Sequence, residues 1–81
     1  MAESVEATVK RVVIKIVRKP DTEFTATTTF KDLNADSLDI VQMLVALEDT
    51  YDIEIQDEEL QDITNMGEFI AYIKRKVDGK N

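Results

Sequence analysis

The chain has 81 residues, 43% of them hydrophobic, which suffices for one small folded domain but not for a second core. It has no cysteine and no histidine, which excludes disulfide bonds, thiolate metal sites, cysteine nucleophiles and the commonest general base. The formal net charge of −7 argues against nucleic acid as a partner, because its phosphates would be repelled. We expect one domain over residues 1–81, ordered over about 3–77, in a monomeric cytoplasmic protein. No stretch approaches the roughly 20 apolar residues that a membrane span needs.

The first predicted element is a helix over residues 3–19. Its apolar residues recur at helical spacing over more than three turns. The β-branched run 12–14 would also suit a strand, but Lys15 breaks the alternation that a strand requires. Pro20 should end the helix, because the residue before a proline avoids the helical region. The predicted buried stripe is Val5, Val9, Val12, Val13, Ile16 and Val17.

Residues 21–34 are expected to form a long ordered loop, with Phe24, Phe30 and Leu33 as its anchors in the core. A second helix should then start at Asp36 and Ser37 and run to about residue 51. Asp36 suits the N-cap position, since its side chain can accept a hydrogen bond from a backbone N–H two or three residues further on.

A short third helix is predicted at residues 57–60, where acidic residues in the first turn complement the helix dipole. The last helix should open at Asn65, with Glu68 three residues on in a capping-box pattern. Its expected buried face is Met66, Phe69, Ile70, Ile73 and Val77. The fold class is therefore all-α: a small antiparallel four-helix bundle, three main helices plus a short third, with a long loop after the first helix.

The second helix has apolar residues on two opposite faces. Ile40, Met43, Leu44, Leu47 and Tyr51 share one third of its circumference and form the expected core face. Residues 36–62 hold ten acidic residues and no basic residue, and the far face of this helix interleaves apolar with acidic side chains. An exposed apolar stripe framed by acids is typical of a protein-binding surface, although single exposed aliphatic residues are common. The stripe is Leu38, Val41 and Val45.

Ser37 alone is an ordinary residue for a helix start, and without a histidine the chain has nothing obvious to activate it as a nucleophile. However, residues 32–39, Asp-Leu-Asn-Ala-Asp-Ser-Leu-Asp, closely resemble the phosphopantetheine attachment motif of acyl carrier proteins. The resemblance continues through residues 46–48, 51–55, 57–59 and 63–64, and covers about 30–73 without a gap.

The resemblance implies a carrier without catalytic residues or metal ligands. A phosphopantetheinyl transferase would attach a 4'-phosphopantetheine arm to Ser37, and the arm would hold acyl groups as thioesters for fatty-acid or related biosynthetic enzymes. These partners would have basic docking surfaces and contact the second helix. The family's interior can shelter an acyl chain, for which Met43, Leu47 and Ile63 would be suitable lining. By position, the implied contact residues are Asp36, Leu38, Asp39, Val41, Val45, Glu48 and Asp49.

Three positions depart from the commonest family pattern. Asn34 replaces a glycine, which a left-handed turn would tolerate; Gln42 replaces a frequent glutamate, and Gln56 a common proline. These departures leave open a specialised carrier of a polyketide, aminoacyl or other lipid pathway. An unmodified acidic helical adaptor is the alternative of a different class.

A calcium-binding loop is a third alternative. Asp32, Asn34 and Asp36 match the first ligand positions of an EF-hand loop. The pattern then fails, because Ser37 stands where the loop needs glycine and Met43 where it needs a bidentate glutamate. The sequence therefore does not favour a metal site.

Overall fold

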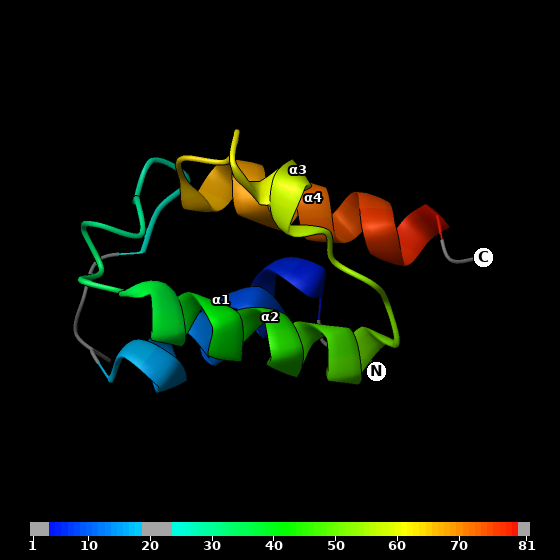
Figure 1. The fold of residues 1–81 in the computed structure, drawn as a ribbon, viewed down its shortest axis with the longest axis horizontal. Helices are drawn as coiled ribbons and strands as arrows, with labels where there is room; N and C mark the ends of the chain where they lie inside the picture. Colours follow the sequence, from blue (N-terminus) through cyan, green and yellow to red (C-terminus); the bar gives the residue numbers. More distant parts are fainter. Residues whose placement is uncertain (1–3, 19–23, 80–81) are drawn as a thin grey trace.

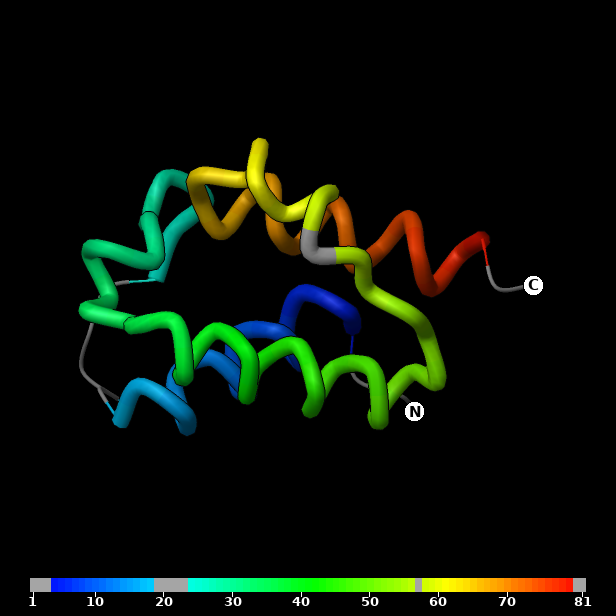
Figure 2. Tube along the Cα trace, in the orientation of Figure 1, coloured from blue at the N-terminus to red at the C-terminus, as the bar shows by residue number. Residues whose placement is uncertain are grey.

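In the computed structural model, residues 4–18 and 24–79 are described. Their regular elements are four helices, α1 (Val5–Val17), α2 (Ser37–Tyr51), α3 (Asp57–Leu60) and α4 (Met66–Gly79), which confirms the predicted all-α class. α1 packs against both α2 and α4, and runs in the opposite direction to them (Figures 1 and 2). None of the helices in the described part is long and apolar enough to cross a membrane.

α1 resolves the ambiguity between helix and strand in favour of the helix. Ser4 is its N-cap, and the Ser4 hydroxyl accepts a hydrogen bond from the Ala7 backbone N–H at 3.1 Å. Val9 and Val13 are fully buried. The helix ends at Val17, two residues before the predicted end, because Arg18 adopts a left-handed conformation (φ 59°). The expected role of Pro20, and the start of the loop at 21–23, lie outside the described residues.

The loop before α2 is anchored as predicted. Leu33 is fully buried, and Phe24 and Phe30 are half-buried against the core. The Phe30 ring meets the Phe69 ring edge to face, with 5.5 Å between centroids and an angle of 68° between the ring planes. The loop therefore belongs to the packed structure and fixes where α2 begins.

Two backbone hydrogen bonds join this loop to the start of α4. The Met66 N–H donates to the Thr28 carbonyl at 2.7 Å, and the Gly67 N–H donates to the Ala26 carbonyl at 2.9 Å. A Cβ at position 67 would lie 3.0 Å from both the Cβ and the carbonyl oxygen of Ala26. The close approach of loop and helix thus depends on a glycine at 67.

Replacing Gly67 by alanine should lower the free energy of unfolding by about 1–3 kcal/mol, because the added methyl group must push the loop away. Gly79→Ala is the matched control, since a Cβ there meets nothing within 4 Å. Its effect should be neutral or stabilising by up to about 1 kcal/mol, as alanine is the better helix former. Urea unfolding followed by circular dichroism measures both, and equal stabilities for the two variants would contradict the close contact.

The start of α4 has the predicted capping box, in which Thr64 also takes part. The Asn65 side-chain oxygen accepts a hydrogen bond from the Glu68 N–H at 2.9 Å, as expected. The Glu68 carboxylate accepts from the N–H and the hydroxyl of Thr64, at 3.1 and 2.9 Å, and the Asn65 backbone N–H also interacts with it, as the pattern predicts. These hydrogen bonds from Thr64 hold the pKa of Glu68 below its usual value. The helix itself extends through Gly79, beyond the expected ordered end at 77.

The core is formed mainly by aliphatic side chains of α1, α2 and α4. On the predicted α4 face, Met66, Phe69 and Ile73 are fully buried, whereas Ile70 and Val77 are half-buried. Sequence analysis missed one large core residue of α4, Tyr72. The buried apolar residues are Val9, Val12, Val13, Leu33, Met43, Leu44, Leu47, Ile55, Met66, Phe69, Tyr72 and Ile73.

A polar contact joins the short helix α3 to α4. The Tyr72 hydroxyl donates to the Glu59 carboxylate at 3.0 Å and accepts from the Gln56 N–H at 3.3 Å. The Lys76 ammonium lies 3.1 Å from the same Glu59 oxygen and 5.6 Å from the centre of the Tyr72 ring. A helix of four residues is too short to be stable alone, so this contact and packing from the core hold it in place.

Stability should fall in acid partly through Glu59. The hydrogen bonds from Lys76 and Tyr72 hold the pKa of the Glu59 carboxyl below its usual 4.5. The folded chain therefore binds this proton less readily than the unfolded chain, and the contribution to stability is present above about pH 4.5 and is lost as pH falls further. In Glu59→Gln that part of the acid-induced fall in Tm should disappear. The neighbouring exposed Glu58→Gln should keep it, and melts between about pH 7 and pH 3 compare the two.

Candidate functional site

Ser37 is the first residue of α2, and its neighbour Asp36 caps the helix. The Asp36 carboxylate accepts from the Asp39 N–H at 2.9 Å, and the Asp39 carboxylate accepts from the Asp36 N–H at 3.4 Å. This reciprocal capping box confirms Asp36 as the N-cap. The side chain of Ser37 is exposed, and no hydrogen bond within residues 4–18 and 24–79 engages its hydroxyl. Capping is thus done by Asp36, which leaves the Ser37 hydroxyl available for chemistry.

A tightly bonded turn leads into this helix start. Thr29 and Asp32 exchange hydrogen bonds between side chain and backbone, at 3.1 and 3.0 Å. Asn34 has φ 58°, the left-handed conformation that sequence analysis expected asparagine to tolerate there. The Ala35 N–H then donates to the Phe30 carbonyl at 3.0 Å. The backbone just before Ser37 is therefore held by several local contacts.

The same turn provides no metal site. Asp32 is engaged by the Thr29 backbone, and Asp36 by that of Asp39. In the part of the chain that the structure describes, no group of three or more acidic, histidine or cysteine side chains could hold a metal ion.

The outer face of α2 is exposed where an apolar stripe was predicted. Leu38, Val41 and Val45 have 64%, 53% and 56% of their surface accessible, while Met43 and Leu47 on the opposite face are fully buried. Asp49 continues this outer face one turn further on and is also exposed. We call Leu38, Val41, Val45 and Asp49 the α2 ridge. It is an apolar surface that ends in a carboxylate and lies on the same helix as Ser37.

The acidic side chains on and beside the α2 ridge differ in whether they make hydrogen bonds within the chain. Glu48 is half-buried, and its carboxylate accepts a hydrogen bond from the Ile55 N–H at 3.0 Å, which ties the segment after α2 back onto the helix. Asp36 and Asp39 are bound to each other's backbone in the capping box. Asp49 makes no hydrogen bond or ion pair within the described residues. Asp49 is therefore the carboxylate of this set with most freedom to meet a partner.

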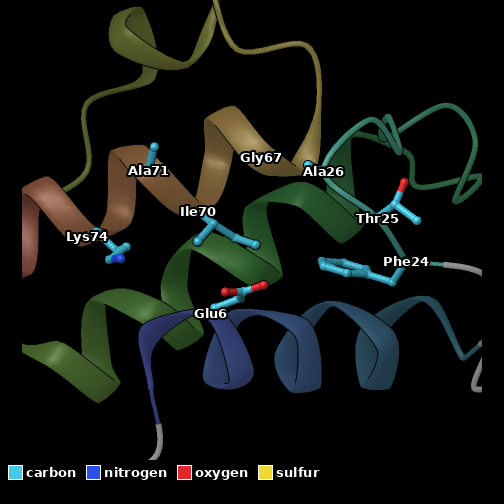
Figure 3. A pocket seen from close by; sticks show the side chains of 8 residues that line it. All are labelled: Glu6, Phe24, Thr25, Ala26, Gly67, Ile70, Ala71 and Lys74. Atoms are coloured by element: carbon cyan, nitrogen blue, oxygen red, sulfur yellow. The ribbon is translucent and has the colours of Figure 1, made fainter.

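One hollow of about 290 Å³ lies between the start of α1, the loop at 24–26 and α4 (Figure 3). The Phe24 ring and the Ile70 side chain face it, with the Glu6 carboxylate below Ile70. Met43, Leu47 and Ile63, the lining suggested for an acyl chain, do not line this hollow. Met43 and Leu47 instead fill the core, and Ile63 packs half-buried against it.

Comparison with known proteins identifies the family. Residues 7–73 match the family model described as "Phosphopantetheine attachment site". An acyl carrier protein of an Exiguobacterium species is 38% identical over 76 residues, which are 93% of this chain and 96% of that protein. An acyl carrier protein of Streptococcus pyogenes is 38% identical over 68 residues, 84% of this chain and 89% of that protein.

A solved structure gives the same result for the fold. The solution structure of the holo acyl carrier protein from Geobacter metallireducens superposes with a TM-score of 0.83 at 25% sequence identity, over 94% of this chain and 88% of that one. The run around Ser37 that resembles an attachment motif, the helical fold and the matched residues all agree. The chain therefore belongs to the acyl carrier proteins, the family that carries covalently attached phosphopantetheine.

Proposed function

We propose that Ser37 is the attachment residue, and that the chain presents acyl groups on its 4'-phosphopantetheine arm to enzymes of fatty-acid synthesis in the cytoplasm, itself catalysing no reaction. The observation that carries this proposal is the exposed Ser37 hydroxyl at a helix start whose cap is already formed by Asp36. A serine that capped its own helix would have its hydroxyl engaged by a backbone N–H.

The surroundings of Ser37 suit a phosphate ester. The hydroxyl stands at the N-terminus of a 15-residue helix, where the helix dipole stabilises negative charge. The carboxylates of Asp36 and Asp39 are bound to backbone N–H groups, which reduces their repulsion of a phosphate. The residues present therefore fit the group.

Attachment forms a bond between the Ser37 oxygen and the phosphorus of the phosphopantetheine part of coenzyme A, and the nucleotide part leaves. The chain has no histidine, and the neighbouring carboxylates of Asp36 and Asp39 already accept hydrogen bonds from backbone N–H groups. The hydroxyl proton would therefore go to a base of the phosphopantetheinyl transferase. When bound, the arm supplies a thiol that holds acyl groups as thioesters, which are more reactive than oxygen esters. The role of this chain is to position the arm and to bind the enzymes that act on it.

The α2 ridge is the proposed docking surface for these enzymes. Its apolar side chains are exposed beside Ser37, and Asp49 offers a charge to a basic partner. Leu38, Val41 and Val45 would be buried on docking, with Asp49 at the rim. Asp36, Asp39 and Glu48 would contribute negative potential while serving the fold of α2.

Incubation with coenzyme A and a phosphopantetheinyl transferase tests the attachment site. The purified chain should gain the mass of one phosphopantetheine group and one titratable thiol. The thiol is diagnostic, because the polypeptide itself has no cysteine. Peptide mapping should place the added mass on the segment that contains Ser37. A modification on any other segment would contradict the proposal.

A further inference from the structure

A second hollow, of about 400 Å³, lies between α1 and α2, which run side by side (Figure 1). Its α1 wall carries three cationic side chains, Arg11, Lys15 and Arg18, all exposed. We call this hollow the basic groove. It contrasts with the negative charge of the whole chain and of the neighbouring α2.

The remaining lining of the basic groove is apolar or uncharged. Val12, Ile16 and Ala46 are buried or half-buried and form its apolar part. Gln42 and Thr50 supply its polar α2 wall, and the Thr50 hydroxyl donates to the Ala46 carbonyl at 2.7 Å. Among the described residues that line the groove, none carries a carboxylate. An occupant that combined negative charge with apolar side chains would match both parts of this surface.

The basic groove and the α2 ridge are adjacent faces of one helix. Gln42, Ala46 and Thr50 of the groove each follow a ridge residue directly in sequence, and one residue corresponds to a rotation of about 100° around a helix. A partner that covers Val41 and Val45 therefore reaches the edge of the groove.

This arrangement constrains the partner's charges. Basic partner groups that extend from the α2 ridge towards α1 would meet the cations of the basic groove on the adjacent face, and like charges repel. We infer that the basic groove binds an acidic amphipathic segment of an enzyme that docks on the α2 ridge. The inference rests on the proposed function. The docking surface of such an enzyme would carry charges of both signs, with basic groups facing the ridge and acidic groups facing α1.

Two synthetic peptides test the groove on the unmodified, isotope-labelled chain by nuclear magnetic resonance. The first has blocked ends and combines glutamate with leucine at helical spacing; the second has lysine in place of every glutamate. The acidic peptide should shift the amide signals of groove residues such as Val12, Ile16 and Ala46. The basic peptide should instead shift the ridge signals of Val41, Val45 and Asp49.

Charge-neutral variants identify the side chains responsible. Lys15→Gln combined with Arg18→Gln should weaken binding of the acidic peptide about five-fold, the effect of losing two exposed ion pairs. Lys10→Gln combined with Lys74→Gln is the matched control, since it removes the same charge outside the groove, and it should change the affinity less than about two-fold. Gln42→Glu should also weaken binding of the acidic peptide, because it places a carboxylate in the groove.

Three results would overturn the inference. One is equal weakening in the groove and control variants. Another is inorganic phosphate that competes with the acidic peptide at the same concentration, which would indicate a small-anion site. The third is binding to vesicles with anionic lipid that depends on Lys15 and Arg18, which would indicate a membrane face. Loading of Ser37 is measured separately. If the chain accepts the arm but does not bind the acidic peptide, only the inference about the basic groove is contradicted. If it binds the peptide but does not accept the arm, only the proposed attachment site is contradicted.

Discussion

Replacing Ser37 by alanine should abolish loading of the arm completely. The alanine variant should show no mass increase and no titratable thiol after incubation with coenzyme A and a transferase, because the oxygen that would bond to phosphorus is absent. The fold should survive, since the Ser37 side chain is exposed and its hydroxyl makes no hydrogen bond within the described residues. The free energy of unfolding should therefore stay within about 0.5 kcal/mol of that of the parent chain.

Ser4 provides a matched control, because it is the other serine of the chain and also stands at a helix start. Its hydroxyl accepts a hydrogen bond from the Ala7 N–H at 3.1 Å, so Ser4→Ala should cost about 1 kcal/mol of stability. Loading should nevertheless be complete. The two serines thus separate structure from chemistry: one substitution affects stability and not the arm, and the other does the reverse. A thiol gained by the Ser37→Ala variant would refute the assignment.

The second large effect is expected at Phe69. This side chain is fully buried and meets Phe30 edge to face. Its replacement by alanine removes the largest fully buried side chain of the described residues and leaves a cavity, a change that costs about 3–5 kcal/mol in protein cores. A domain of this size is expected to have a free energy of unfolding of only about 5 kcal/mol. The variant should therefore be largely or wholly unfolded near body temperature.

Thermal melts followed by circular dichroism test this prediction. Val41→Ala serves as the control, since this side chain is apolar but more than half exposed on the α2 ridge. It should melt within about 4 °C of the parent chain, because surface substitutions rarely change stability by more than about 0.5 kcal/mol. A cooperative melt of Phe69→Ala close to that of the parent chain would show that the core depends on this ring less than its burial indicates.

Much of the fold could be predicted because helical periodicity is a local signal. The apolar residues of α1 recur over more than three turns, which outweighed the strand preference of residues 12–14. In α2 the same periodicity separated buried Met43 and Leu47 from exposed Val41 and Val45. Asp36 was recognised as a cap from its type and place. The fold prediction was therefore most accurate where neighbours in sequence are also neighbours in space.

Contacts between distant segments could not be predicted in the same way. Glu48 was assigned to a docking surface from its place on the helix, yet its carboxylate also binds the Ile55 N–H seven residues further on. The contact of Tyr72 with Glu59 depends on how α3 lies against α4, which no local pattern specifies. The basic groove needs α1 beside α2, so its cations were visible in the sequence but their arrangement was not. A local signal did exist for one missed detail: Asp36 and Asp39 have the three-residue spacing of a capping box.

The crowding of roles on α2 limits how its sequence can evolve. A change at Met43 or Leu47 disturbs the interior, and a change at Val41 or Val45 alters the proposed docking surface. A change at Asp36 loosens the helix start that holds Ser37, the proposed attachment residue. Few positions around this helix can therefore be substituted without affecting the core, the proposed docking surface or the helix start. Divergence among carriers of this kind should therefore accumulate on α1 and α4, where new specificities could arise while α2, with its proposed attachment residue, stays nearly constant.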